Sequence, residues 1–207
     1  MIAVIDYDAG NIRNVEKALQ FLGCEPCVTR DPEKLQQAQA AILPGVGAFG
    51  DAMESLNRFH LTQAIRDFVR SGRPFLGICF GLQLLFAESE ESPGVEGLSL
   101  LPGRVVRFPG DMGLKIPHIG WNSLAFPENR SPLFAGLPEE AYVYFVHSYY
   151  LQCEDPQAVA AVAEYGIPFH AAVAKGNLFA TQFHPEKSGE TGLSILRNFA
   201  AMASRND

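Results

Sequence analysis

The amino-acid sequence predicts an α/β protein with a mostly parallel central sheet, flanked by helices and extended by additional antiparallel strands. Two observations support this prediction. In the first half, continuous apolar runs alternate with amphipathic stretches, which is typical of parallel strands covered on both faces. In the second half, aromatic and β-branched residues cluster between turn signals, which favours antiparallel strands.

The first half supplies the expected parallel strands and the helices between them. Ile12, Val15 and Leu19 recur at the spacing of one helical face. The strands are apolar runs that end at turn residues such as Pro44-Gly45. The expected elements are, in order, a strand at 2–7, a helix at 12–22, a strand at 40–43, one or two helices within 51–69 and a strand at 75–78.

The second half is expected to add strands and one closing helix. The strands are expected within 105–108, 123–126, 142–150, 159–164 and 179–183. The closing helix carries Leu193, Leu196 and Phe199 on its apolar face. Because no repeat, low-complexity tract or linker divides the chain, we expect a single domain over residues 1–207.

Charge and hydropathy exclude two classes of partner. The chain has 16 basic and 23 acidic side chains, and its net charge of −7 is scattered, so no basic stripe is available for nucleic acid. No stretch approaches the ~20 apolar residues of a membrane span, so no membrane is expected. The N-terminal residues lack the features of a signal peptide, which predicts a cytoplasmic protein.

Cysteine usage predicts reduced thiols. The four cysteines are few for 207 residues, which argues against a disulfide framework. Cys24 and Cys27 form a single CxxC, but no second pair or nearby histidine completes a zinc set. We therefore expect neither a metal nor a cofactor.

The segment 77–81, Gly-Ile-Cys-Phe-Gly, places Cys79 between an apolar strand and the helix-forming residues 82–86. This order matches a nucleophile elbow, in which the nucleophile occupies a tight and strained turn between small residues. A helix N-terminus would also favour the thiolate form. Alternatively, Cys79 is a buried core thiol and the glycines are loop residues.

A thiol nucleophile needs a base, and His184 has the most informative surroundings of the five histidines. It follows the apolar run 179–183, at the carboxyl end of an expected strand. In an extended segment Glu186 would share a face with His184, so its carboxylate could orient the imidazole. Taken alone, the pair could equally be a strand-end residue and a solvated charge.

Together, the elbow and His184-Pro185-Glu186 resemble the class I, or triad, glutamine amidotransferases over essentially the whole chain. Within that family, further motifs resemble the glutaminase subunits of imidazole glycerol phosphate synthases. These motifs are Asp6-Tyr7 with Gly10-Asn11, Pro44 to Phe49, Ile116 to Asn122, Tyr144 to Tyr149 and Phe183 to Ser188. Phe80 departs from the leucine of the family pattern, but the contact expected there is a backbone N–H.

The resemblance implies that the substrate is L-glutamine. Cys79 would attack the side-chain amide to form a thioester, His184 would shuttle protons, and Glu186 would orient His184. The implied oxyanion residues are Val46, Gly47 and Phe80, where glycine lets a peptide plane rotate. The implied substrate contacts are Gly45, Gly47, Gln83, Ser148 and Tyr149; Tyr149 could equally be a packed aromatic residue.

The resemblance also implies a heterodimer with a cyclase subunit of the (β/α)8-barrel type, which would use the ammonia in histidine biosynthesis. The candidate interface residues are Asn11, Asn14, Trp121 and Tyr144. Trp121, the only tryptophan, is expected in a solvated Gly-Trp-Asn turn, although a lone tryptophan is more often part of a core. No phosphate-binding loop for the cyclase's nucleotide is recognisable.

Three other functions compete with this interpretation. The chain could serve a different synthase, for example one that aminates surface sugars. It could be a regulatory relative that keeps the fold without the chemistry, although the intact Cys79, His184 and Glu186 argue against this. It could also be a cysteine hydrolase of the peptidase-like branch, although an acid two residues after the base favours the amidotransferase.

Overall fold

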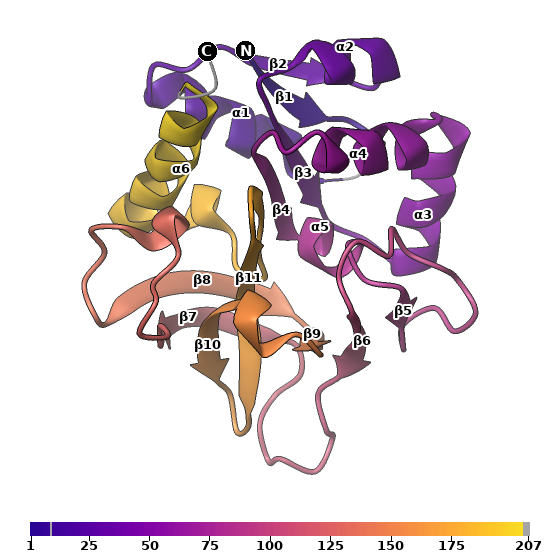
Figure 1. Ribbon diagram of the computed structural model, residues 1–207. Helices are drawn as coiled ribbons and strands as arrows, with labels where there is room; N and C mark the ends of the chain where they lie inside the picture. The colour runs from indigo at the N-terminus through magenta and orange to yellow at the C-terminus, as the bar shows by residue number, and fades with distance from the viewer. Residues whose placement is uncertain (9, 205–207) are drawn as a thin grey trace.

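The computed structural model describes residues 1–8 and 10–204, and its main feature is a 10-stranded mixed sheet with helices on both faces (Figure 1). The parallel part runs in the order β2 (Pro26–Thr29), β1 (Ile2–Ile5), β3 (Ala40–Gly45), β4 (Phe75–Cys79) and β12 (Leu178–Thr181). Strands β1, β3, β4 and β12 are short, mostly apolar runs whose residues are all buried, as expected for strands covered on both faces. The edge strand β2 differs, because only Thr29 of its four residues is buried.

Antiparallel strands continue the sheet beyond β12. They are β11 (Pro168–Lys175), β9 (Tyr149–Cys153) and β6 (Gly103–Arg107), with β10 (Val159–Glu164) also paired to β11. The short β5 (Glu88–Ser89) lies parallel to β6 at the edge of the sheet. A separate two-stranded antiparallel sheet consists of β7 (His118–Leu124) and β8 (Ala141–His147), and we call it the β7–β8 ribbon.

The helices divide between the two faces of the sheet because the strand side chains alternate. One face packs against α1 (Ile12–Phe21) and α6 (Gly189–Ala203), and the other against α2 (Pro32–Gln37), α3 (Phe49–Arg58), α4 (Leu61–Arg70) and α5 (Phe80–Gln83). In β1, Ile2 and Val4 join the first core and Ala3 and Ile5 join the second. The described residues also include three 3-10 turns between these elements: η1 (Pro132–Phe134), η2 (Pro156–Ala158) and η3 (Pro185–Lys187).

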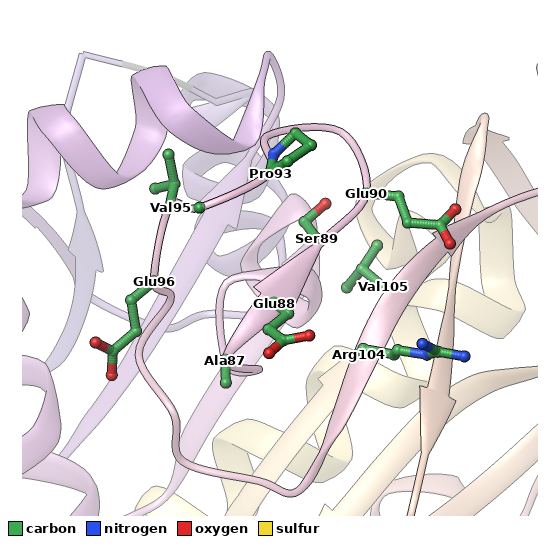
Figure 2. Close-up of a pocket in the computed structure, with 10 residues that line it drawn as sticks. Ala87, Glu88, Ser89, Glu90, Pro93, Val95, Glu96, Arg104 and Val105 are labelled. Atoms are coloured by element: carbon green, nitrogen blue, oxygen red, sulfur yellow. The ribbon is translucent and has the colours of Figure 1, made fainter.

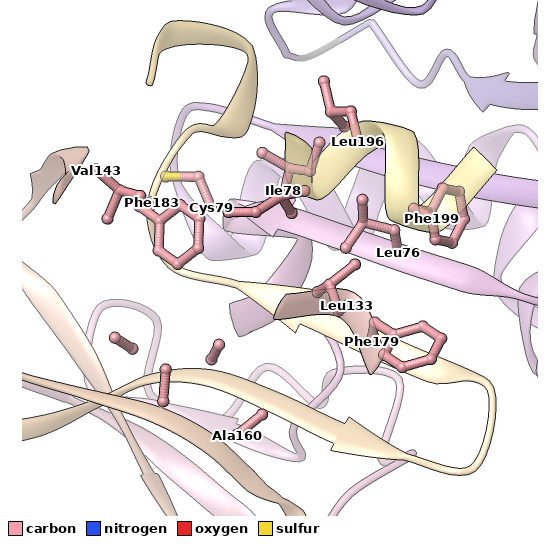
Figure 3. Close-up of a cluster of buried hydrophobic side chains, with 14 of the residues drawn as sticks. Leu76, Ile78, Cys79, Leu133, Val143, Ala160, Phe179, Phe183, Leu196 and Phe199 are labelled. Carbon is pink, nitrogen blue, oxygen red and sulfur yellow. The ribbon is translucent and has the colours of Figure 1, made fainter. Parts of the chain in front are cut away.

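The core on the α1 and α6 face extends as far as Cys79. Figure 3 shows Ile78 and Leu76 of β4 beside Leu196 and Phe199 of α6, with Phe183 next to Cys79. All of these side chains are buried. Cys79 therefore stands where the apolar core meets the carboxyl edge of the parallel strands.

The predicted fold class is confirmed, and several boundaries differ from the expected ones. The region 51–69 contains two helices, and the run 142–150 is two strands separated by Ser148. The helix expected over 82–86 is wrong: α5 is a single turn that ends at Gln83. The backbone N–H groups of Leu85 and Phe86 instead close tight turns on Leu82 and Gln83.

Candidate active site

The elbow at Cys79 has the strained geometry that its glycines predict. Cys79 ends β4 with φ 54° and ψ −102°, a conformation that residues with a side chain rarely adopt. A Cβ on Gly81 would lie 1.9 Å from the carbonyl oxygen of Leu43, and one on Gly77 would lie 2.6 Å from the carbonyl oxygen of Gly81. Both glycines are therefore required by close backbone approach.

His184 and Glu186 form a buried pair beside the elbow. His184 Nδ1 lies 2.9 Å from Glu186 Oε1, and the side chains are 3% and 1% exposed. The pairing agrees with the sequence interpretation, but the expected extended segment is wrong. His184 precedes the 3-10 turn η3, so the turn, rather than a strand pleat, brings the carboxylate back to the imidazole.

His184 also interacts with Cys79, so its protonation depends on burial, on Cys79 and on Glu186 together. Burial lowers the pKa of His184, but hydrogen bonding to Cys79 and Glu186 outweighs burial and raises the pKa to about 10. Because Nδ1 faces Glu186, the other ring nitrogen is available for the sulfur. The arrangement places an imidazolium beside the Cys79 sulfur, and an adjacent cation of this kind is one of the ways in which a cysteine nucleophile is activated.

The glycine loop after β3 lies next to the elbow. Gly45 pairs with Cys79 in the register of β3 and β4, and Gly47 has φ 121°. A Cβ on Gly45 would lie 2.5 Å from the Tyr7 hydroxyl oxygen and 2.6 Å from Phe80 Cβ. Val46 is 43% exposed, and it lines the same cavity as Cys79.

A cavity of about 310 Å3 brings most of the predicted site residues together. Its walls come from the loop after β3, the elbow, β8, the Ser148 turn and the segment after β12. It is lined by Val46, Gly47, Cys79, Phe80, Gln83, Glu91, Pro117, Val146, His147, Ser148, Tyr149, His184 and Lys187. All of the expected catalytic, oxyanion and substrate residues are in this lining except Gly45 and Glu186.

Several residues of the cavity were not predicted from the sequence. Glu91 and Lys187 place opposite charges on its lining, and the Glu91 carboxylate accepts a hydrogen bond from the backbone N–H of Phe49 at 2.9 Å. Burial raises the pKa of Glu91. Lys187 is part of the Phe183 to Ser188 motif, whereas Glu91 comes from a loop with no distinguishing sequence signal.

The four candidate interface residues lie in different surroundings. Asn11 contacts the His184–Glu186 pair, since its Nδ2 donates to Glu186 Oε1 at 3.3 Å, and Asn14 is exposed on α1. Trp121 and Tyr144 are opposite each other in the β7–β8 ribbon, with ring centroids 6.1 Å apart. The turn expected at Trp121 is wrong: the residue is in the middle of β7 and is 56% exposed.

A larger hollow of about 610 Å3 lies away from this site, at the edge formed by β5 and β6 (Figure 2). Its charged side chains, Glu88, Glu90, Glu96 and Arg104, are all exposed. None of the predicted nucleophile, base or substrate residues lines it. We therefore place the chemistry in the smaller cavity, where the buried titratable groups converge.

The described residues contain neither a metal-binding cluster nor a membrane-spanning helix. Over residues 1–8 and 10–204, no group of three or more His, Cys, Asp or Glu side chains is arranged to hold a metal ion. Cys24, Cys27, Cys79 and Cys153 are free thiols. Within the same described ranges, every helix is too short or too polar to cross a membrane.

Comparisons with known proteins agree with this geometry. The family model "Glutamine amidotransferase class-I" matches residues 3–203. "Imidazole glycerol phosphate synthase subunit HisH" of Syntrophotalea carbinolica is 53% identical over 98% of this chain and 100% of its own length. The protein of the same name from Halalkalibacterium halodurans is 49% identical over 99% and 97%. A solved structure described as a glutamine amidotransferase superposes with a TM-score of 0.77 at 22% identity, covering 99% of this chain and all of that one.

Proposed function

Because this chain belongs to the class-I glutamine amidotransferase family, we propose that it is the glutaminase subunit of an imidazole glycerol phosphate synthase. It would hydrolyse L-glutamine to glutamate and deliver the ammonia to a partner subunit. The observation that supports the proposal most directly is the buried His184–Glu186 pair, 2.9 Å apart, set against a cysteine on a strained elbow. The full-length similarity to HisH proteins selects this branch of the family.

In the proposed reaction, the Cys79 thiolate attacks the side-chain carbonyl carbon of glutamine. The imidazolium of His184 then protonates the amide nitrogen, and ammonia leaves as the carbonyl re-forms in a thioester. His184, now neutral, takes a proton from water, which attacks the thioester and releases glutamate. Glu186 stabilises the imidazolium and keeps Nδ1 engaged, so that the other nitrogen faces the reacting atoms.

The tetrahedral intermediates require donors for their oxyanion. We assign this role to the backbone N–H of Phe80 at the start of α5 and to N–H groups at Val46 and Gly47. The peptides around Gly47 can rotate because glycine tolerates both signs of φ. Gly45 serves by being small: its close approach to Phe80 leaves no room for a side chain.

The amino-acid end of glutamine carries a carboxylate and an ammonium group. We assign its polar contacts to Gln83, Ser148 and Tyr149, which line the cavity. Lys187 and Glu91 also line it, and they offer charges opposite to the carboxylate and to the ammonium group. This complementarity favours a free amino acid over a peptide-bound glutamine, which has neither charge.

The partner is proposed to be a cyclase subunit of the (β/α)8-barrel type, in a heterodimer. The outward face of the β7–β8 ribbon supports a docking surface there, because Ile119, Trp121 and Tyr142 are at least half exposed. Pro117 and Val146, at the cavity, connect this face to the active site. Ammonia released at Cys79 would thus emerge beside the partner.

Two broader expectations belong to the same proposal. We propose residues 1–207 as a single amidotransferase domain, since the two cores lie on opposite faces of one sheet. We also propose a cytoplasmic location, which is supported by the free thiols of all four cysteines. Of the competing functions, the regulatory relative and the peptidase-like hydrolase gain no support from a buried triad and a charged cavity of amino-acid size.

The test uses the complex with the cyclase subunit. Cys79→Ser should abolish product formation from glutamine while product formation from added ammonium salt continues, because the two reactions are placed in different subunits. Cys153→Ser, at a buried thiol outside the cavity, is the matched control and should keep both activities. Glutamine-dependent turnover that survives Cys79→Ser would rule out the proposed nucleophile.

A further inference from the structure

Gln182 contacts the sulfur of Cys79 from within the core. The residue follows β12 and is completely buried. Its Nε2 lies 3.8 Å from Cys79 Sγ, and its Oε1 accepts a hydrogen bond from Gln83 Nε2 at 3.1 Å. A buried primary amide is costly unless its polar atoms form hydrogen bonds, so both contacts matter.

The network fixes which end of the Gln182 amide faces the sulfur. Gln83 Nε2 also donates to the carbonyl oxygen of Tyr149 at 3.3 Å, and an amide nitrogen can only donate. Gln182 must therefore present its oxygen to Gln83. Its NH2 group is then directed at Cys79 Sγ, where a donor stabilises a thiolate.

The other polar neighbour of the sulfur, the carbonyl oxygen of Val146, favours the thiol over the thiolate. The carbonyl oxygen of Val146 lies 3.9 Å from Cys79 Sγ and can accept a hydrogen bond from a thiol but not from a thiolate. Ile78 and Phe183, beside Cys79 in Figure 3, are apolar and offer no donor. Gln182 and His184 are thus side chains that favour the charged sulfur. The buried Tyr7 hydroxyl also interacts electrostatically with Cys79, but burial and this interaction both raise its pKa, so it stays neutral over the pH range of the test.

Two buried histidines hold the far end of the same network. His147 Nδ1 lies 2.9 Å from the carbonyl oxygen of Tyr149, and His147 Nε2 lies 3.0 Å from His118 Nδ1. Since the carbonyl can only accept, His147 carries its proton on Nδ1 and accepts from His118 on Nε2. Burial lowers the pKa of His147 to about 3 and that of His118 to about 4, so both rings are neutral near pH 7.

We propose that Gln182 is a positioning residue that stabilises the Cys79 thiolate, and that a buried chain through Gln83, Tyr149 and His147 to His118 holds its amide in place. The inference rests on the proposed function, because it gives Cys79 the role of nucleophile. It goes further in connecting that nucleophile to β7, whose outward face carries Ile119 and Trp121. A change in the ribbon can reach the sulfur through hydrogen bonds alone.

The test measures how fast iodoacetamide alkylates Cys79 in the isolated full chain between pH 5 and 10, read by peptide mass mapping. In Gln182→Met, which keeps the side-chain length without the amide, the rate at pH 7 should fall about tenfold, equivalent to about 1.4 kcal/mol. The pH of half-maximal rate should rise by about one unit. In His118→Phe the rate at pH 7 should fall about threefold and the pH of half-maximal rate should rise by about half a unit, because the substitution releases the tautomer of His147.

Two control variants each remove a nearby hydrogen bond that is not part of the network from Gln182 to His118. Thr181→Val loses a bond from Oγ1 to the carbonyl oxygen of Phe183, and Tyr165→Phe loses a bond to Lys115 but keeps the ring stacked on His118. Both should leave the pH of half-maximal rate unchanged. If Gln182→Met does not fold, Gln182→Asn, whose amide is one methylene shorter, gives the same readout.

The outcomes separate this inference from the proposed function. An unchanged pH dependence in a folded Gln182→Met or Gln182→Asn chain would overturn the role of Gln182. A shifted pH dependence in the Gln182 variants without a shift in His118→Phe would overturn the proposed hydrogen-bond path from Gln83 to His118. If Cys79 of the unsubstituted chain reacts no faster than the partly exposed Cys27, the proposed nucleophile itself fails.

Discussion

Glu186 uses only one of its two carboxylate oxygens. Oε1 accepts from His184 Nδ1 at 2.9 Å and from Asn11 Nδ2 at 3.3 Å, whereas Oε2 is buried and accepts no hydrogen bond from the described residues. Because the carboxylate accepts only these two hydrogen bonds from the described residues, its negative charge acts mainly on the imidazole of His184. This asymmetry explains why Glu186 contributes to the raised pKa of His184 although burial opposes it.

We predict that Glu186→Gln lowers kcat for glutamine hydrolysis in the complex by about 10²–10⁴-fold, with little change in KM. The amide keeps the shape of the side chain but removes the charge that stabilises the imidazolium, so the pKa of His184 should fall. Steady-state kinetics measure the effect. Glu190→Gln, on the exposed first turn of α6, is the matched control and should retain full activity. A normal kcat in Glu186→Gln would contradict the triad assignment.

The sequence predicts the candidate catalytic residues better than it predicts the residues that contact them. Cys79, His184 and Glu186 occur in short motifs whose spacing has a chemical reason. Gln182 lies inside an ordinary apolar run, and only the pairing of β12 with β4 brings it to the sulfur. Glu91 reaches the cavity from a loop 12 residues beyond Cys79, and no local pattern marks it.

Among the elements, the β7–β8 ribbon combines a buried and an exposed face. His118 and Phe145 point into the core, and Trp121 and Tyr142 are half exposed. This alternation is the signature of an antiparallel pair with one face in solvent, except that the solvent face is aromatic. Aromatic residues concentrate at protein interfaces because they bury large areas with little loss of side-chain entropy.

We predict that Trp121→Ala weakens binding of the cyclase subunit by about tenfold or more, because it removes a large anchor near the centre of the exposed face. Isothermal titration with the purified subunits measures the change. Phe21→Ala is the matched control: Phe21 is 76% exposed, but it lies at the end of α1 away from Asn11 and should not affect binding. Equal losses in both variants would argue against a docking surface on the ribbon.

The ribbon also makes stability depend on pH. The folded-state pKa values of His147 and His118 lie below the unfolded value of about 6.5, so the unfolded chain binds more protons at low pH. Their stabilising contribution is complete above about pH 6.5 and is lost as the pH falls toward the folded values. His184 has the opposite sign, because its raised pKa adds stability that is lost as the pH rises.

We predict that His147→Phe reduces the difference in unfolding free energy between pH 7.5 and pH 5.0 by about 2 kcal/mol, the share of one histidine over that interval. Comparing the variant with the original chain cancels the contribution of His184. Urea unfolding at the two pH values provides the measurement. His60→Asn, at an exposed histidine, is the control, and an undiminished pH difference in His147→Phe would contradict a neutral buried ring.

Element boundaries show where sequence patterns stop being informative. The parallel strands β1, β3 and β4 are apolar runs and were predicted, whereas β11 was not. Its central residues, 171–174, are Ala-Ala-Val-Ala, and alanine has little strand preference and little apolar surface. Strands β9, β10 and β12 pair with β11, so its structure comes from its neighbours rather than from its own side chains.

For the molecule as a whole, the glycine loop after β3 is the place where control is expected. Gly47 has a positive φ, and a Cβ there would meet no atom within 4 Å. The loop lines the cavity together with Cys79 and with Val146 of the β7–β8 ribbon. A side chain at position 47 would have space, but the positive φ of Gly47 disfavours every residue other than glycine. A partner could therefore favour one orientation of a peptide plane without repacking the core.

We predict that the isolated chain hydrolyses glutamine slowly, and that the partner with its nucleotide raises kcat by about 10²–10³-fold, the usual effect of one oxyanion donor. Gly47→Ala should blunt this activation while complex formation continues, because it restricts the peptide and leaves the ribbon intact. Ammonia release, with binding measured in parallel, tests both statements. Equal turnover by the isolated chain and the complex would contradict the switching model.

The aromatic face of the ribbon also has a consequence for the life of the unassembled chain. Ile119, Trp121 and Tyr142 expose a contiguous apolar surface whenever no partner covers it. Molecules produced in excess of the partner would self-associate through this surface and would be bound by chaperones or degraded by proteases. If the proposed docking holds, balanced synthesis of the two subunits is a condition for solubility as well as for ammonia transfer. We then expect overproduction of this chain alone to yield less recoverable protein than co-production.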